Sequence, residues 1–251
     1  MNLIVCSDIH SNKEALQTFC EDISSFDYSG IIFLGDLIGY NPDPEEAVKT
    51  AMKWEKEGKL ITKISGNHDN AVLDLNNANR FNSNARRAII WTAENISETS
   101  MKWLKSMTGP VKINEKAIAC HGSIRDSNEY IFNEDIALDN FLLFPRNIQM
   151  AFFGHTHVPI IYELKNDDTL ITHWMNEEIE FFLDERSKYL INPGSVGQPR
   201  NGDNRLSYII WDTKKNVIHY KKKNYNYIIT QKKIYEAKLP EISAMRLEEG
   251  Y

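Results

Sequence analysis

Five short apolar runs in this chain each end in a compact set of polar residues, and no other feature constrains the fold as strongly. The runs are residues 3–6, 31–34, 60–64, 117–120 and 150–153. The polar sequences after them are Ser-Asp-Ile-His, Gly-Asp, Gly-Asn-His-Asp, His-Gly and Gly-His-Thr-His. Each run has the length of a buried strand, and helical patterns separate most of them. The alternation predicts an α/β fold with polar side chains gathered at the strand ends.

Helical periodicity fills much of the chain between these runs. The predicted helices cover residues 13–23, 44–57, 84–95, 98–107 and 135–143. Asp43 followed by Pro44 is typical of a helix start with Asp43 as its N-cap, and Gly58 ends that helix.

After Pro159 the pattern changes to short strand-like runs separated by turn residues. These runs cover residues 160–164, 169–173, 179–183, 189–191, 206–212 and 217–220, and a last helix is predicted at 230–238. Neither a repeat nor a linker rich in Gly, Ser and Pro interrupts the chain. We therefore predict one domain over residues 1–251, with a helical cap-like segment at about 71–110, in which two sheets pack together with helices outside.

Composition argues against several functional classes. The net charge of −6 disfavours broad nucleic-acid binding, and the basic run 221–223 is predicted to be a solvated strand end. No apolar stretch approaches the roughly 20 residues that span a membrane, and the chain start does not resemble a signal peptide. The three cysteines are odd in number and form no CxxC pair, which favours a reducing, cytoplasmic compartment.

The polar residues at the strand ends form the candidate functional site. In open α/β sheets, ligands bind beyond the carboxyl ends of the strands, and five of the seven histidines fall there. The full set is Asp8, His10, Asp36, Asn67, His68, His121, His155 and His157. Carboxylates and imidazoles together suit Mn, Fe, Zn or Ni rather than Ca or Mg alone. The other two histidines, His173 and His219, lie in late strands without evident partners and are interpreted as structural.

The five polar sequences, in this order and at this spacing, resemble the motifs of the calcineurin-like metallophosphoesterases. The resemblance implies a four-layer α/β/β/α sandwich with two mixed sheets packed face to face. Residues 39–44, 192–200 and 239–241 further resemble a bacterial and archaeal branch grouped with the diadenosine tetraphosphatases and small phosphodiesterases. The similarity therefore extends nearly from end to end.

This resemblance implies a site for two metal ions. Asp8, His10 and His157 would hold the first ion, Asn67, His121 and His155 the second, and Asp36 would bridge both. The two carboxylate oxygens of Asp36 can serve two ions. His155 and His157 are two positions apart, so their rings can reach different ions on a turn but would share a face in a regular strand. Two such ions acidify a bridging water that attacks phosphorus.

Three further residues are expected to act on the substrate or to support those that do. His68 is predicted to face the substrate, where it would stabilise developing charge or protonate the leaving oxygen. Asp69 either orients His68 or caps the following helix. Arg200 is a candidate phosphate clamp, whereas Arg125 is expected in a surface ion pair. Asn192 is expected to be structural, with an approach to the metals as the alternative.

The chain departs from the protein serine/threonine phosphatases after the bridging aspartate. Those enzymes carry Asp-Arg-Gly soon after it, and here Leu-Ile-Gly-Tyr follows. We therefore predict a phosphodiesterase or nucleotide pyrophosphohydrolase of small substrates, with dinucleoside polyphosphates among the candidates. The alternatives are a phosphomonoesterase or protein phosphatase, and a non-catalytic scaffold poor in metal. The substrate, the metals and the oligomeric state stay open at this point.

Overall fold

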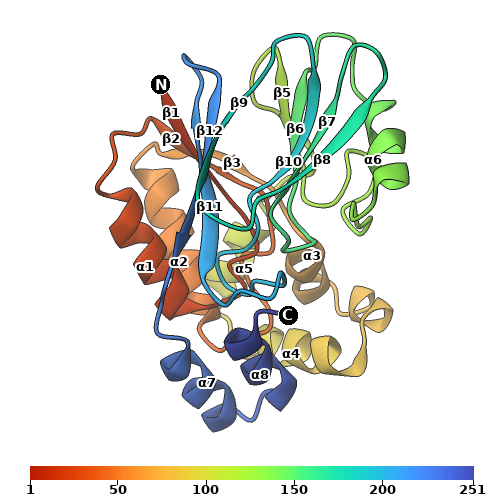
Figure 1. Ribbon diagram of the computed structural model, residues 1–251. Helices are drawn as coiled ribbons and strands as arrows, with labels where there is room; N and C mark the ends of the chain where they lie inside the picture. Colours follow the sequence, from red (N-terminus) through yellow and green to blue (C-terminus); the bar gives the residue numbers. More distant parts are fainter.

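The computed structural model describes residues 1–251 and places two six-stranded sheets face to face (Figure 1). The first sheet has the order β3 (Leu60–Lys63), β2 (Gly30–Phe33), β1 (Asn2–Cys6), β11 (Leu206–Asp212), β12 (Val217–Lys223) and β9 (Ile179–Phe182). The second has the order β4 (Val111–Lys112), β5 (Ala117–Ala119), β6 (Met150–Phe152), β10 (Lys188–Asn192), β7 (Ile160–Leu164) and β8 (Leu170–Trp174). Each sheet is mixed, because β1, β2 and β3 are parallel, as are β5, β6 and β10, and the other pairings are antiparallel.

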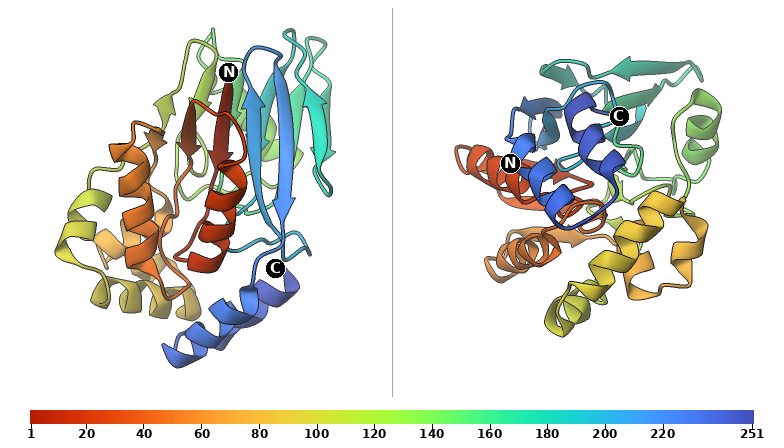
Figure 2. Two further views of the ribbon diagram at one scale, coloured as in Figure 1. Left: turned by 90° about the vertical axis from the view of Figure 1, so that its left-hand side faces the viewer. Right: turned by 90° about the horizontal axis from the view of Figure 1, so that it is seen from below.

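Helices cover the outer faces of both sheets, which confirms the predicted four-layer α/β/β/α fold (Figures 1 and 2). They are α1 (Lys13–Ile23), α2 (Pro44–Lys56), α3 (Asn67–Leu73), a 3₁₀ helix (Asn77–Arg80), α4 (Ser83–Glu94), α5 (Glu98–Leu104), α6 (Glu134–Phe141), α7 (Tyr227–Glu236) and α8 (Glu241–Glu249). Helices α1, α2 and α5 pack on the first sheet, and α6 packs on the second. None of these helices has both the length and the apolar character needed to cross a membrane.

Strand β1 shows why its sequence is apolar without a break. Leu3 and Val5 point into the core between the two sheets, whereas Ile4 and Cys6 point into the core between the first sheet and its helices. Successive side chains of a strand face opposite sides, so a strand covered on both faces has no position for a polar residue. The first polar residues can appear only where the strand ends.

The predicted elements agree with the structure apart from shifts of a few residues and four misses. Helix α3 starts inside the third polar motif, and α8 begins directly after Pro240, beyond the last helix that we predicted. Strand β4 is too short to give a pattern, and the 3₁₀ helix has none. Asp43 is the N-cap residue of α2, as predicted, but its side chain makes no capping hydrogen bond and instead pairs with Lys233 at 2.8 Å.

The basic run 221–223 is the end of β12, as predicted, and Lys221 and Lys223 are 27% and 41% exposed, but the middle residue is not solvated. The Lys222 side chain is 1% exposed, and its ammonium donates to Asp203 and, at 2.8 Å, to the carbonyl of Asn176. Asp203 also accepts from Arg205. Lys222 therefore belongs to a buried charge network that sequence composition alone cannot distinguish from a surface run.

Asp203→Asn should lower the free energy of unfolding by about 3 kcal/mol, because a buried ammonium would lose its charged partner. Burial alone would raise the pKa of Asp203, but hydrogen bonds from Arg205 and Lys222 outweigh it and hold the pKa well below its usual range. The stabilisation is thus present above the unfolded-state pKa of about 3.9 and is lost as the pH falls through the lower folded-state pKa. Urea unfolding at several pH values measures both effects.

The matched control removes the ammonium as well as the carboxylate. If the loss comes from an unpaired charge, Asp203→Asn combined with Lys222→Met should be more stable than Asp203→Asn alone. If the losses of stability from Asp203→Asn and from Lys222→Met simply add in the double variant, the proposed pairing of the two residues would be contradicted.

Candidate metal centre

The predicted site residues lie at one end of the two sheets, in loops after β1, β2, β5 and β6 and at the start of α3. The first two loops are tied together, because the backbone nitrogens of Asp8 and His10 donate to the carbonyls of Gly35 and Asp36, each at 3.0 Å. Because β1 and β2 are adjacent and parallel, the motifs that follow them lie side by side although they are far apart in the sequence.

Five of the candidate ligands have backbones in the left-handed region. Their φ angles are 54° for Asp8, 48° for His10, 54° for Asp36, 65° for His155 and 60° for His157. Such conformations cost about 1–3 kcal/mol each for residues other than glycine and gather at functional sites. They turn each side chain away from its strand direction, and the rings of His155 and His157 consequently join different groups.

The first group of ligand atoms comes from Asp8, His10, Asp36 and His157, all buried. Asp8 Oδ1 lies 3.3 Å from His157 Nε2 and 3.7 Å from His10 Nε2. The two imidazole nitrogens are 3.2 Å apart, and His10 Nε2 lies 3.5 Å from Asp36 Oδ2. Four potential donor atoms therefore surround one small volume, as metal coordination requires.

The second group is formed by Asp36, Asn67, His121 and His155. His121 Nε2 lies 3.3 Å from Asp36 Oδ2 and 3.0 Å from Asn67 Oδ1. His155 completes the group with Asp36 and His121, its ring centroid 5.0 Å from that of His121. The structure thus brings together all seven predicted metal ligands, in the two sets that the resemblance implied.

Asp36 belongs to both groups, but through one oxygen and not through two as we expected. Its Oδ2 faces both His10 and His121, whereas Oδ1 accepts a 2.9 Å hydrogen bond from the backbone nitrogen of His68. The backbone hydrogen bond fixes the carboxylate so that a single oxygen points between the two groups.

Backbone carbonyls on the far side of the histidine rings determine which ring nitrogen can bind a metal. Nδ1 of His10, His121 and His157 lies 3.1, 2.9 and 2.6 Å from the carbonyls of Ile38, Leu34 and Gln198. Since a carbonyl only accepts, Nδ1 carries the proton and Nε2 offers a lone pair to the site. In His155 the arrangement is reversed, because Nε2 lies 3.3 Å from the carbonyl of Asn128 and Nδ1 is left for the site.

Burial also favours the metal-binding form of most of these rings. It lowers the pKa of His10 and His157 well below the usual range and that of His155 to about 3, and neutral imidazole is the form that binds a metal. His121 differs: burial lowers its pKa, but the Asp36 carboxylate outweighs this and raises it to about 9. A cation bound here would displace that proton and become the counter-charge of Asp36.

Two buried carboxylate oxygens show that the donor set fits a cation. Asp8 Oδ1 and Asp36 Oδ2 are buried and accept no hydrogen bond in the protein. Leaving such an acceptor unsatisfied is costly, and burial raises the pKa of Asp8 to about 7. Both oxygens point into the ligand groups, so a divalent cation would satisfy them.

Close packing explains why glycine precedes two of the ligand motifs. A Cβ on Gly66 would collide with Oδ1 and the backbone nitrogen of Asp36, and a Cβ on Gly154 would collide with Ser7 and approach Asp8 Oδ2 to 2.9 Å. These glycines let neighbouring loops approach the two carboxylates closely.

His68 lies beside the ligands without joining them. Its ring centroid is 4.4 Å from that of Tyr40, 4.8 Å from that of Phe81 and 4.9 Å from that of His10. Nδ1 is buried against Gly39 without a hydrogen-bond partner, and the residue lines the pocket above the metal centre. Burial lowers the pKa of His68 to about 4.

Asp69 makes no contact that would orient His68. Its carboxylate accepts hydrogen bonds from the backbone nitrogens of Leu37, Ile38 and Gly66, at 3.3, 3.1 and 2.9 Å. Of the two roles considered, the structure supports the helix cap, which also ties α3 to the loop that carries Asp36. A catalytic role for Asp69 has no geometric support.

The pocket above the metal centre has a volume of about 310 Å³. It is lined by Tyr40, Asn67, His68, Arg80, Phe81, Asn82, Ala85, Asp126, Asn128, Tyr130 and His155. Arg80, at the end of the 3₁₀ helix, was not predicted, because no motif surrounds it and only the tertiary fold brings it here.

Arg200 lies at the edge of this pocket. Its guanidinium carbon is 5.5 Å from the centroid of the Tyr40 ring, and Nη2 donates to Gln198 Oε1 at 2.7 Å. Its backbone nitrogen donates to the carbonyl of His157, and its buried Nε has no partner. The side chain is thus held near the candidate ligands, and its buried Nε–H is unpaired.

The remaining candidates lie outside the centre. Arg125 pairs with Glu129 at the surface, as predicted. His173 and His219 are separate from the cluster, but the expectation that they lack partners is wrong, because they contact Glu163 at 2.9 Å and Glu180 at 3.2 Å.

Asn192 is structural, as we favoured. Its Nδ2 donates to the carbonyl of Gly154 at 2.7 Å and to Thr156 Oγ1 at 3.0 Å. It therefore supports the loop that carries His155 and His157.

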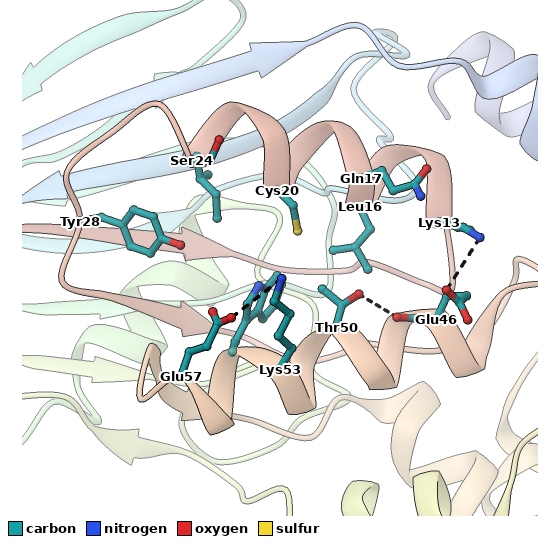
Figure 3. Close-up of a pocket in the computed structure, with 12 residues that line it drawn as sticks. Lys13, Leu16, Gln17, Cys20, Ser24, Tyr28, Glu46, Thr50, Lys53 and Glu57 are labelled. Carbon is teal, nitrogen blue, oxygen red and sulfur yellow. Dashed lines mark hydrogen bonds and ion pairs between the residues drawn. The ribbon is translucent and has the colours of Figure 1, made fainter.

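A further cavity of about 370 Å³ lies between α1 and α2 (Figure 3). No predicted site residue lines it, and the Lys13–Glu46 ion pair at 3.8 Å joins its two helices. It is a groove of helix packing, away from the polar cluster.

The chain is similar to several known proteins over most of its length. The family model described as "Calcineurin-like phosphoesterase superfamily domain" matches residues 1–216. An uncharacterised protein of Methanocaldococcus jannaschii is 34% identical over 250 residues, covering 98% of this chain and 96% of that protein. The crystal structure of a metallophosphoesterase from Sphaerobacter thermophilus has 31% identity and a TM-score of 0.85 over all of both chains. A hypothetical protein of Pyrococcus horikoshii, at 17% identity, shares the fold with a TM-score of 0.80 over 100% of this chain and 98% of the other.

Proposed function

The chain belongs to the calcineurin-like phosphoesterase superfamily, and from this premise we propose that it is a two-metal phosphodiesterase or nucleotide pyrophosphohydrolase acting on small substrates. The observation that carries the proposal is the shared oxygen of the two ligand groups. Asp36 Oδ2 faces His10 at 3.5 Å and His121 at 3.3 Å. One buried anion placed between two sets of donors is what a pair of neighbouring cations needs.

The bound ions would supply a nucleophile from water at neutral pH and compensate the negative charge of a phosphoryl group. The ligands that would hold them are Asp8, His10 and His157 on one side and Asn67, His121 and His155 on the other, with Asp36 between. The carbonyls behind the imidazoles keep the ligand nitrogens deprotonated and aimed. A mixed set of imidazole, carboxylate and amide donors suits Mn, Fe, Zn or Ni.

The chain's own residues would position the substrate. His68 lines the pocket beside the ligands and can donate an N–H to a phosphoryl oxygen. Arg80 in the same pocket and Arg200 at its edge offer guanidinium groups, which bind phosphate bidentately. Arg80 shares the pocket with the carboxylate of Asp126, so its charge is partly balanced. Arg200, with its unpaired Nε, is the guanidinium left for a further phosphate, which favours a diester with a second phosphate or a nucleotide anhydride.

The size and lining of the pocket favour a small molecule over a protein substrate. A volume of about 310 Å³ is within the range of small-ligand sites, and the aromatic rings of Tyr40, Phe81 and Tyr130 lie on its wall. We therefore propose a small phosphorylated compound, with nucleotides among the candidates, as the partner of this site, in the cytoplasm and without a nucleic-acid or membrane partner.

Hydrolysis of paired aryl substrates tests the proposal. With Mn²⁺ supplied, kcat/KM for bis(p-nitrophenyl) phosphate should exceed that for p-nitrophenyl phosphate by about tenfold or more, a difference of roughly 1.4 kcal/mol in the activation barrier. A strong preference for the monoester would shift the assignment to a phosphomonoesterase. Absence of turnover together with absence of bound transition metal after reconstitution would indicate a scaffold.

A further inference from the structure

We propose that a second pocket next to the metal centre, walled by Phe132 and Trp174, binds the nucleobase of a nucleotide substrate whose phosphate lies at Arg200. The inference rests on the proposed function and deepens it, because it adds a binding subsite and a substrate class. The pocket has a volume of about 300 Å³.

The two wall residues are large aromatic side chains that the fold leaves open. Phe132 is 60% exposed and Trp174 is 58% exposed, although burying such rings is among the most favourable contributions to stability. Both line the second pocket, whose floor includes Val158 and Ile160. The protein thus presents an apolar slot whose lining includes two exposed aromatic rings.

The slot lies beside the loop that carries two of the candidate metal ligands. Thr156, which lines it, stands between the ligands His155 and His157. Val158 directly follows His157, and Trp174 of β8 pairs in register with Ile160, three residues after that ligand. The loop that supplies two metal ligands therefore also forms one wall of the slot.

Arg200 connects the two pockets. It lines the slot, and its guanidinium lies over the ring of Tyr40, which lines the pocket above the metals. Arg200 has a buried Nε without a partner. A phosphate at this guanidinium would have the metal centre on one side and the aromatic slot on the other.

The chemistry of the slot selects a planar and neutral group with polar edges. Arg200 is the only charged side chain in its lining, so a phosphate belongs there and an uncharged group in the remainder. The side-chain amides of Asn176 and Asn201 at the rim are hydrogen-bonded to no other part of the chain. Aromatic faces that stack on a ring, together with amides that reach its edge, match a nucleobase better than an aliphatic alcohol.

Binding of two phosphates that differ only in the base tests the subsite. Isothermal titration of the Mn²⁺-loaded protein should give an affinity for adenosine 5′-monophosphate about tenfold to a hundredfold higher than for ribose 5-phosphate, as expected for stacking on aromatic side chains. The double variant Phe132→Ala with Trp174→Ala should abolish this ratio and leave the affinity for ribose 5-phosphate unchanged. Quenching of Trp174 fluorescence by the nucleotide, absent in Trp174→Phe, provides a second readout.

Leu142→Ala is the matched control, because Leu142 is an exposed apolar residue next to α6 that lines neither pocket. It should keep the wild-type ratio. Equal affinities of the wild type for the two phosphates, including no measurable binding of either, or an unchanged ratio in the double variant would overturn the subsite. So would a change of sedimentation coefficient in the double variant, which would assign the aromatic residues to an interface between copies.

Failure of the subsite is distinguishable from failure of the proposed function. If the protein hydrolyses the aryl diester but binds the two phosphates equally, the proposed phosphodiesterase activity is supported and the nucleobase subsite is contradicted. If binding depends on the base but no diester is hydrolysed, the subsite is supported and the proposed activity is contradicted.

Discussion

Asp36→Asn should reduce hydrolysis of an aryl phosphodiester by about 10³-fold or more, the rate equivalent of several kcal/mol of metal-derived stabilisation. The amide has the shape of the carboxylate and can still accept the hydrogen bond from the His68 backbone. What it loses is the negative charge on the oxygen that faces both ligand groups. Two neighbouring cations without this anion would repel each other, so at least one should leave.

Metal content separates this explanation from a general loss of structure. Wild-type protein reconstituted with Mn²⁺ should contain about two ions per chain, and Asp36→Asn should contain one or fewer while it keeps its circular dichroism spectrum. Asp27→Asn, a matched change at an exposed carboxylate that pairs with no other group, should keep both ions and full activity. Full activity of Asp36→Asn with a complete metal complement would contradict the shared-oxygen site.

The sequence was sufficient to predict which side chains gather at the candidate metal centre, because the order of the strands places their ends together. Asp8 and Asp36 follow parallel neighbouring strands, and such strands end at the same edge of a sheet. The apolar runs identify the strands, since a strand buried on both faces admits no polar residue. The order of the runs therefore indicates which loops meet, and the left-handed backbones of five of these residues then turn the side chains toward one another.

The contacts around the ligands depended on packing and could not be predicted from the sequence. Asp69 follows His68 directly, yet its carboxylate turns to the backbone of Leu37 and Ile38, which the sequence places more than 30 positions away. The single oxygen that Asp36 offers to both groups depends on a backbone hydrogen bond from α3, a helix whose start lies inside the motif itself.

Charge pairs between residues far apart in the chain could not be predicted from the sequence either. Lys222 stands in a run of three lysines, and only the distant Asp203 explains why it is buried. Arg80 and Arg200 lie on unrelated segments, and the fold brings both to the metal centre. Short motifs thus predict which residues form the candidate metal centre, whereas the groups expected to select the substrate depend on how the whole chain packs.

His68→Asn should lower kcat by about 10²–10³-fold, the loss typical of one hydrogen-bond donor at a developing charge, while leaving both metal ions bound. The ring lines the pocket without belonging to either ligand group. No carboxylate contacts it, because Asp69 is bound to the backbone, and burial lowers its pKa to about 4. His68 is therefore neutral at pH 7 and suited to donate an N–H to a phosphoryl oxygen rather than to protonate a leaving group.

The identity of the leaving group distinguishes the two roles that were open for His68. A hydrogen bond to a non-leaving phosphoryl oxygen is lost equally for every ester, so His68→Asn should slow diesters of p-nitrophenol and of a poorly leaving alcohol by the same factor. A general acid would matter far more for the poor leaving group. His219→Asn, a matched change at a histidine of β12 that pairs with Glu180 and lines no part of the site, should change neither rate. If His68→Asn slows hydrolysis mainly of the alkyl ester, His68 is the proton donor. If the variant loses bound metal, His68 is a ligand. Either result would contradict the role inferred from the geometry.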